Sequence, residues 1–263
     1  MARSTSLNTG RAVREAAREG AWTGPTAGLA PGYVQTNVVI LPAAYAFDFL
    51  RFCLRNPKPC PVVDVTGVGE PHPDPAVAAG ADLRTDVPRY RVYRNGELVE
   101  ERTDIRDLWQ EDFVGVLLGC SFTFEQALLA AGVPVRHVEC GCNVPMYITH
   151  HETRPAGPFH GPLVVSMRPI PGHQVTRAVE VTARFPQTHG APVYIGDPRG
   201  LGIADLNRPD FGDPVPLHPG EVPVFWACGV TTHLAVMNAR LPVVITHAPG
   251  HMFVTDLTMD DGR

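Results

Sequence analysis

Short apolar runs typical of strands alternate with runs of helical periodicity through the second half of the chain. This alternation predicts an α/β fold in which helices cover sheets and neighbouring strands run parallel. Strands are expected at 163–167, 192–195, 222–227 and 243–246, and helices at 175–185 and 231–238. We therefore expect an α/β protein with a layered mixed α/β domain and a second, smaller βαβ-containing α/β domain inserted into it.

Joints rich in proline and glycine divide the chain into these two predicted units. The joints at 154–162 and 209–220 flank a passage with strand and helix signals. The main α/β domain is predicted over 1–158 and 221–263, and the smaller inserted α/β domain over 159–220.

Local signals also predict the elements of the first half. A threonine cap and a closing glycine favour a helix within 9–20, and Phe47, Leu50 and Leu54 form the apolar stripe of a helix over 45–54. Strands are expected at 34–41 and 61–68. Asn95-Gly96 between two alternating runs predicts a β-hairpin with a type I′ turn.

Composition excludes several function classes. The 263 residues carry a net charge of −5, which argues against a nonspecific nucleic-acid binder. No apolar run is long enough for a membrane span, and charged residues interrupt the N-terminus where a signal peptide would be apolar. Six cysteines are too few for a disulfide scaffold. We expect a cytoplasmic protein whose partner is a small carboxylate or amino acid, with neither nucleic acid nor membrane, and the sequence leaves a homo-oligomer open.

One internal similarity links two distant segments. Around Cys120 and Cys228 an apolar run ends at the cysteine, a small residue, an apolar residue and a threonine follow, and proline stands fourteen residues after the cysteine. Each segment predicts a cysteine at a strand-to-helix turn. Helix N-termini attract anions and lower thiol pKa values toward neutrality. Two facing turns would form a carboxylate cradle with hydroxyl donors from Ser121, Thr123, Thr231 and Thr232, whereas two cysteines that simply pack in the core are the alternative.

The segment that follows the first repeat holds further polar candidates. Cys140, Cys142, His150 and His151 are soft enough for zinc, but a Cys-x-Cys spacing and adjacent histidines argue against one shared ion, so we predict no metal site. Glu139 is instead assigned to catalysis, and Asn143 to substrate binding.

Two histidines and an arginine follow predicted strands. His247 and His251 flank a Pro-Gly turn at the end of a strand, where α/β sheets bind ligands, and are candidates for general acid or base. Arg168 also ends a strand, and its guanidinium could hold a substrate carboxylate through two hydrogen bonds.

Several long motifs, in order along the chain, resemble the D-glutamate cyclase family, whose bacterial members are called hydro-lyases. They include Ala30-Pro-Gly-Tyr-Val-Gln-Thr-Asn37, Leu118-Gly-Cys-Ser-Phe-Thr-Phe-Glu125, Asn143-Val-Pro-Met-Tyr147, Gly161-Pro-Leu-Val-Val-Ser-Met-Arg-Pro-Ile170, Phe225-Trp-Ala-Cys-Gly-Val-Thr231 and Ile245-Thr-His-Ala-Pro-Gly-His-Met-Phe253. Tyr147, inside one of these motifs, is added to the substrate-binding candidates. The sequence departs from the family at Cys142, where related sequences often have arginine.

The resemblance implies a two-domain α/β protein with a lyase activity that removes water, the family reaction being cyclisation of D-glutamate to 5-oxo-D-proline. This chemistry requires no metal or organic cofactor. Two alternatives stay open. One is a cofactor-independent racemase or epimerase that uses Cys120 and Cys228 as its acid and base, and the other is a carboxylate-binding protein without turnover.

Overall fold

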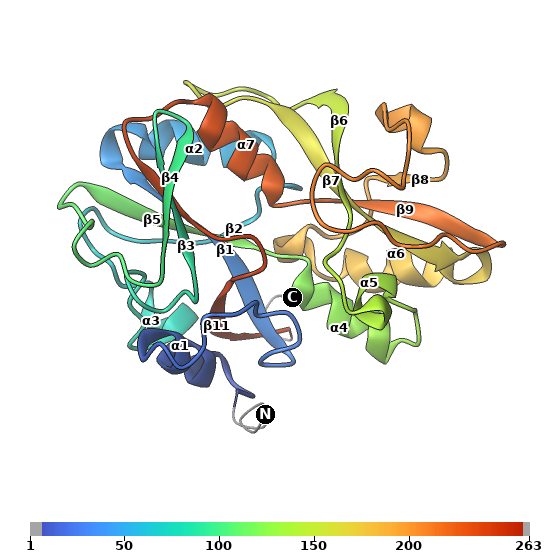
Figure 1. The fold of residues 1–263 in the computed structure, drawn as a ribbon, viewed down its shortest axis with the longest axis horizontal. Helices are drawn as coiled ribbons and strands as arrows, with labels where there is room; N and C mark the ends of the chain where they lie inside the picture. The colour runs from blue at the N-terminus through green and yellow to red at the C-terminus, as the bar shows by residue number, and fades with distance from the viewer. Residues whose placement is uncertain (1–6, 260–263) are drawn as a thin grey trace.

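The computed structural model describes residues 7–259, which form two sheets that lie side by side along the long axis (Figure 1). The strands are β1 (Tyr33–Pro42), β2 (Val62–Val65), β3 (Tyr90–Arg94), β4 (Glu97–Arg102), β5 (Phe113–Gly119), β6 (Met146–Glu152), β7 (Pro162–Pro171), β8 (Tyr194–Ile195), β9 (Glu221–Ala227), β10 (Val244–His247) and β11 (Phe253–Thr258). The helices are α1 (Gly10–Arg18), α2 (Ala43–Arg55), α3 (Pro75–Ala78), α4 (Phe122–Ala130), α5 (Arg136–Cys140), α6 (Val175–Ala183) and α7 (Val230–Asn238). Short 3₁₀ turns are η2 (Gly172–Gln174), η3 (Pro186–Thr188) and η4 (Pro198–Leu201).

The strand pairing differs from the prediction. The first sheet has the order β2-β5-β1-β10-β3-β4, with β11 beside the first half of β1, and the second has the order β6-β7-β9-β8. All strand pairs of both sheets are antiparallel within the described residues, so the predicted parallel pairing is wrong. The α/β class is confirmed, because helices and strands alternate and helices cover both sheets.

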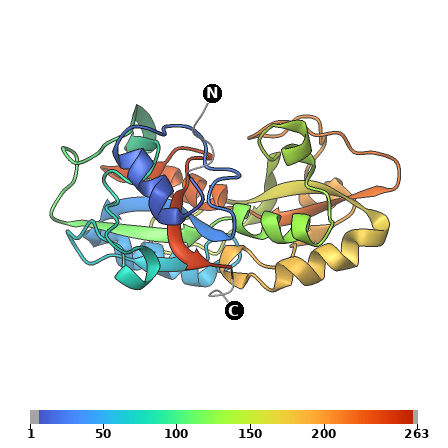
Figure 2. The ribbon, with the colours of Figure 1, turned by 90° about the horizontal axis from the view of Figure 1, so that it is seen from below.

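The reason for the antiparallel pairing lies in where two helices pack. β5 belongs to the first sheet, but α4, which follows it, packs with α6 against the second sheet (Figure 2). In the same way β9 belongs to the second sheet, and α7 packs with α2 against the first. A parallel pair needs a crossover that returns to the same sheet. These helices instead carry the chain from one sheet to the other.

The predicted inserted unit, 159–220, contributes β7 and β8 to the second sheet. The other two strands, β6 and β9, come from outside that range. The division into a main and an inserted domain stays a prediction.

The apolar face of α2 is not the predicted one. Phe47 and Leu54 are 73% and 80% exposed, whereas Phe49 and Phe52 are fully buried. The Phe49 ring meets Phe159 edge to face at 5.1 Å between centroids. The sequence offers two apolar stripes, and the one that also contains Ala46 and Cys53 is wider and covers β1 and β5.

Two local predictions are confirmed. The Thr9 hydroxyl caps α1 by accepting the Ala12 amide hydrogen at 3.2 Å. Asn95 and Gly96 join β3 to β4 with φ values of +52° and +85°, which are the positive angles that a type I′ turn requires.

We expect Gly96→Ala to destabilise the protein by about 2–5 kcal/mol. Alanine at this position would have to adopt the left-handed backbone conformation of Gly96, which costs about 1–2 kcal/mol. Its Cβ would also lie 2.5 Å from the Met237 carbonyl oxygen, and this overpacking costs about 1–3 kcal/mol more. Gly80→Ala is the matched control, because Gly80 has φ +66° and no atom near its added Cβ. Urea unfolding of both variants measures the difference, and equal losses would show that the Met237 contact is harmless.

Candidate active site

The sequence similarity around the two cysteines corresponds to a repeated structure. Cys120 connects β5 to α4, and Cys228 connects β9 to α7. The residues that follow have nearly the same backbone angles, φ −61° and ψ −20° at Ser121 and φ −60° and ψ −19° at Gly229. Each predicted strand-to-helix turn is therefore present.

Each turn is tied to the neighbouring strand by the same hydrogen bonds. The Cys120 amide donates to the Gln35 carbonyl at 3.1 Å, and the Gln35 amide donates to the Thr123 hydroxyl at 3.2 Å. At the other turn, Cys228 donates to the Val164 carbonyl at 3.0 Å, and the Val164 amide donates to the Thr231 hydroxyl at 3.0 Å. The repeated threonines thus hold the turns in place. Their hydroxyls bind backbone groups, whereas the sequence predicted that they bind substrate.

Both thiols line one small cavity between the two turns, which we call the inner cavity. Its volume is about 50 Å³, enough for a carboxylate or a few water molecules. Its polar lining, besides Cys120 and Cys228, consists of Asn37, Ser121, Asn143, His189, His233 and His247. The structure therefore brings together five predicted site residues: the two cysteines, Ser121, His247 and, at the edge, Asn143.

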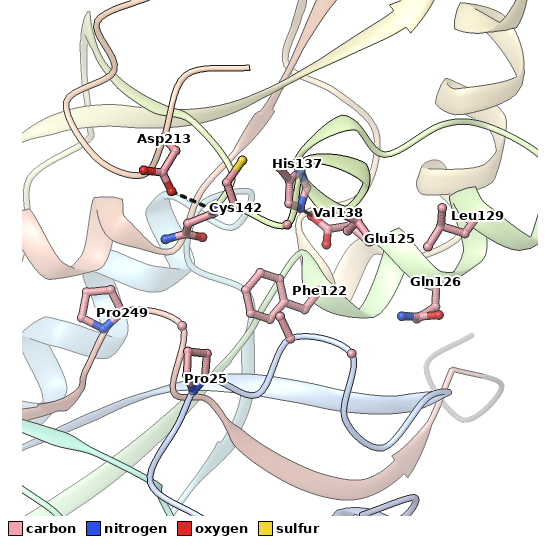
Figure 3. Close-up of a pocket in the computed structure, with 15 residues that line it drawn as sticks. Pro25, Phe122, Glu125, Gln126, Leu129, His137, Val138, Cys142, Asp213 and Pro249 are labelled. Atoms are coloured by element: carbon pink, nitrogen blue, oxygen red, sulfur yellow. Dashed lines mark hydrogen bonds and ion pairs between the residues drawn. The ribbon is translucent and has the colours of Figure 1, made fainter. Parts of the chain in front are cut away.

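A larger cavity of about 520 Å³, the outer cavity, adjoins the inner one (Figure 3). The two share Phe122, Asn143, Pro249 and Gly250, and the Phe122 ring points into the outer cavity in Figure 3. The polar groups found in the outer cavity alone are Glu125, Gln126, His137, Cys142 and Asp213. A ligand with its carboxylate in the inner cavity would extend into this outer space.

The thiols are more basic than the sequence suggests. Burial raises the pKa of Cys120 to about 12 and that of Cys228 to about 11. Backbone amides of Phe122 and Val230, the first residues of α4 and α7, act in the opposite direction, as predicted for a helix N-terminus, but burial outweighs them. The expectation of near-neutral thiol pKa values is wrong, and both cysteines are protonated donors at neutral pH.

The buried histidines of the inner cavity are neutral. Burial lowers the pKa of His189 and His247 to about 4 and that of His233 to about 3. Nδ1 of His247 lies 3.1 Å from the Val38 amide nitrogen and 3.4 Å from the Val38 carbonyl oxygen, and the shorter contact, in which the amide donates to Nδ1, places the proton of the neutral ring on Nε2. His247 is therefore equipped to donate a hydrogen bond to a ligand rather than to carry a charge.

Hydrogen bonds also set the direction of the two asparagines. Asn37 donates its amide hydrogens to the Leu118 and Gly119 carbonyls at 3.2 and 3.0 Å, which leaves Oδ1 as its acceptor. The Asn143 Oδ1 accepts the Val144 amide at 3.0 Å, which leaves its NH₂ group as a donor. The cavity edge thus offers one acceptor and one donor to a ligand.

Besides Thr123 and Thr231, four predicted site residues lie outside both cavities. Arg168 is fully buried and bonds Glu125, Ser121 and Ser166, and Tyr147 is buried in the core of the second sheet with its hydroxyl on the Leu206 carbonyl at 2.7 Å. Glu139 is half exposed on α5 and pairs with Arg136, while His251 bonds the Pro249 carbonyl. The contacts of these four side chains are with other parts of the protein, and none of the four reaches either cavity.

The described residues contain no group of three or more His, Cys, Asp or Glu side chains arranged to hold a metal ion. Cys140 is exposed and Cys142 lines the outer cavity, while the His150 and His151 rings stack edge to face at 4.4 Å. The resemblance led us to expect arginine at position 142, and a longer basic side chain at this position would enter the outer cavity.

Sequence reasoning missed several residues of the two cavities: Asn37, His137, His189, His233 and Asp213. They come from distant loops and strands, and no local pattern joins them to the cysteine turns. Asn37 is the last residue of one motif of the family resemblance, and His233 follows another by two residues, which is the only signal that could have found them.

The buried histidines predict a loss of stability in mild acid. Below pH 6.5 the unfolded chain protonates its histidines, whereas His189, His233 and His247 stay neutral in the folded state until their lowered pKa values near 3–4. The unfolded state then binds more protons, so the free energy of unfolding falls as pH drops from 6.5 to 4, by at most about 1.4 kcal/mol per histidine and pH unit.

Urea unfolding at pH 7.5, 6 and 5 measures this slope. His189→Asn should make it shallower, because asparagine tolerates the left-handed backbone of His189 (φ +81°) and does not titrate. A stability that stays constant between pH 7.5 and pH 5 would contradict the buried neutral histidines.

No helix in residues 7–259 is both long and apolar enough to cross a membrane.

Among solved structures, a nitrogen repressor-like protein from Methanococcus jannaschii aligns with a TM-score of 0.40 and 12% identity, over 96% of this chain and 99% of that chain.

Sequence comparison identifies the family. Residues 114–256 match the family described as D-glutamate cyclase. Proteins named "Putative hydro-lyase" from Thermoanaerobacter sp. (64% identity over 93% of this chain and 92% of theirs), Geobacillus kaustophilus (62%, 93% and 93%) and Rubrobacter xylanophilus (64%, 93% and 94%) are close relatives. The matched segment contains both cysteine turns, and the chain belongs to the D-glutamate cyclase family.

Proposed function

We propose that this protein is a hydro-lyase acting on a small carboxylate or amino acid, with D-glutamate as the first candidate substrate and 5-oxo-D-proline and water as products. The observation that carries the proposal is the pair of related turns, which set a protonated thiol and a helix N-terminus on both sides of one buried cavity. The family and the names of its relatives support the reaction class.

The reaction requires particular groups. The amine nitrogen bonds to the γ-carboxyl carbon, one C–O bond breaks, and two protons of the ammonium group leave with the oxygen as water. The enzyme must therefore deprotonate the amine, stabilise the oxyanion and protonate the leaving oxygen.

The inner cavity suits the leaving carboxyl group. The Cys120 and Cys228 thiols are protonated and can donate to an oxygen that develops negative charge. A thiolate left behind would be stabilised by the backbone amide at the start of its helix. The Nε2 hydrogen of His247 and the amide of Asn143 supply further donors.

The size of the two cavities supports this placement of the substrate. The inner cavity has room for one carboxyl group, whereas the outer cavity has room for the remainder of a small amino acid. The amine and the α-carboxylate would lie near Phe122 and Asn143, which both cavities share.

Proton NMR of the purified protein with D-glutamate, L-glutamate, 5-oxo-D-proline and several hydroxy acids tests the proposal. Formation of 5-oxoproline, or of an alkene from a hydroxy acid, is the expected result and names the substrate. Binding of these compounds with no chemical change would contradict the proposal and leave a carboxylate-binding protein.

The same geometry favours a second candidate, a two-cysteine racemase or epimerase. Both thiols line the inner cavity, and the two turns that carry them repeat each other in structure. One cysteine would remove the Cα proton and the other would return a proton to the opposite face, a reaction that begins only when one thiol has lost its proton. In deuterated buffer, deuterium at Cα without loss of water would favour this reading over water loss.

A further inference from the structure

A buried ion pair lies behind the outer cavity. Arg168 is fully buried, and its Nε lies 3.2 Å from Oε1 of Glu125, which its Nη2 also contacts. Nη1 bonds the Ser166 hydroxyl at 3.0 Å and Nη2 bonds the Ser121 hydroxyl at 3.2 Å. The guanidinium also lies over the rings of Phe124 and Trp226, 5.1 and 5.3 Å from their centroids. Every contact of Arg168 thus holds it in place behind Glu125.

Glu125 is held as a carboxylate by this arrangement. Burial opposes its ionisation, but the charge of Arg168 and the interaction with the His137 ring nitrogen outweigh burial and lower the pKa of Glu125. Because the arginine neutralises it, Glu125 is a weak site for a substrate ammonium group. Its Oε1 atom also lies beside the ring of its other neighbour, His137.

His137 connects this pair to the outer cavity. Its Nε2 atom is buried, lies 3.3 Å from Oε1 of Glu125, and makes no hydrogen bond with the described residues. The His137 ring lines the outer cavity beside Glu125 (Figure 3). A carboxylate accepts hydrogen bonds and cannot donate them, so the neutral ring should carry its proton on Nε2 and its lone pair on Nδ1.

We propose that His137 is the catalytic base that takes the ammonium proton of the bound substrate, with Glu125 and Arg168 as positioning residues. The inference rests on the proposed water loss, which needs a neutral amine. The proton passes from the amine nitrogen to Nδ1, the resulting imidazolium is stabilised by Glu125, and the proton then goes to the leaving carboxyl oxygen. The second proton of the departing water comes from a cysteine thiol, and the nitrogen, which loses one more proton as the amide forms, returns it to that thiolate, so the enzyme ends each cycle unchanged.

The charged groups around His137 are compatible with this role. Glu125 and Arg168 lie behind the ring as a neutral pair, and Arg136, next to His137 on α5, pairs with Glu139 at 3.2 Å and with Glu221 of β9. Across the outer cavity, the Asp213 carboxylate accepts a hydrogen bond from the backbone amide of Asn143 at 2.9 Å (Figure 3). The Glu125 carboxylate, which lies beside Nε2, favours a positive charge on the ring, and the Asp213 carboxylate favours one on a bound ammonium group.

A first experiment is independent of turnover. Long-range ¹H–¹⁵N NMR of the full chain reports which ring nitrogen of His137 carries the proton, with His137→Gln identifying the signal. We expect the Nε2–H form in the wild type, a mixture of both forms in Glu125→Gln, and a shifted Nδ1 resonance on addition of D-glutamate. Glu180→Gln, on the exposed side of α6, is the matched control. The Nδ1–H form, or a spectrum that Glu125→Gln does not change, would overturn the proposal.

A second experiment uses the substrate identified by the panel. We expect His137→Gln to lower kcat about 10²–10⁴-fold and to remove the fall of kcat/KM at acid pH, with little change in ligand affinity. Glu125→Gln should lower kcat less and keep a pH-dependent rate. His173→Gln, at an exposed histidine, should behave like the wild type. A His137→Gln variant with full activity would overturn the inference, whereas a wild type that turns over none of the panel would contradict the proposed function and leave the NMR result to decide the state of His137.

Discussion

Replacing either Cys120 or Cys228 with serine is expected to lower kcat for water loss about 10²–10⁴-fold, with a much smaller effect on KM. Each thiol lines the inner cavity as a protonated donor, with a helix-start amide ready to stabilise its thiolate. A serine hydroxyl fits the same space but releases its proton far less readily. Steady-state kinetics on the substrate identified by NMR measures the loss.

Cys140→Ser is the control for this pair, because Cys140 is exposed and lines neither cavity. It should keep the wild-type rate. If Cys120→Ser and Cys228→Ser also kept that rate, the thiols would be packing residues and the catalytic account of the two turns would be refuted. If only one of the two variants lost activity, the proton donor would be the cysteine that was replaced in that variant.

The second large effect is on stability. Arg168→Met should reduce the free energy of unfolding by about 3–5 kcal/mol, because it leaves the buried Glu125 carboxylate without its partner. The double variant Arg168→Met with Glu125→Gln should recover part of this loss, since no uncompensated charge remains. Urea unfolding at pH 7.5 provides the comparison.

Arg199→Met tests the opposite case. Arg199 pairs with Asp197, but these side chains are 82% and 50% exposed, so solvent screens the pair and no measurable loss is expected. Arg168→Met with wild-type stability would show that the Glu125–Arg168 pair does not act as a buried unit, and the basis for the positioning of His137 would be lost with it.

Much of the fold could be predicted from local sequence signals. The Asn95-Gly96 turn, the threonine cap of α1 and the helix that follows Gln174 depend on a few neighbouring residues, and all three are present. The pairing of strands could not be predicted in this way. It depends on α4 and α7 crossing to the opposite sheets, which is decided by long-range contacts such as those of Phe124 with Trp226.

Part of the candidate site could likewise be predicted from local sequence patterns, and part could not. The two cysteine turns could be found because the same short pattern occurs twice, and the structure shows that both thiols reach one cavity. Arg168 looked like a ligand for a carboxylate because it ends an apolar run. Its partner, Glu125, lies forty-three positions away on another element, and no local pattern reveals that the arginine is already paired. His137 was missed because its contact with Glu125 also joins two separate elements and leaves no local pattern in the sequence.

The most direct test of the central claim is a crystal structure of the protein with 5-oxo-D-proline. We expect the lactam carbonyl to lie in the inner cavity between the Cys120 and Cys228 thiols, and the carboxylate to extend into the outer cavity past Phe122 and Asn143. A ligand bound elsewhere, such as the charged groove beside Arg89 and Glu101, or a cavity that stays empty at saturating concentration, would contradict it.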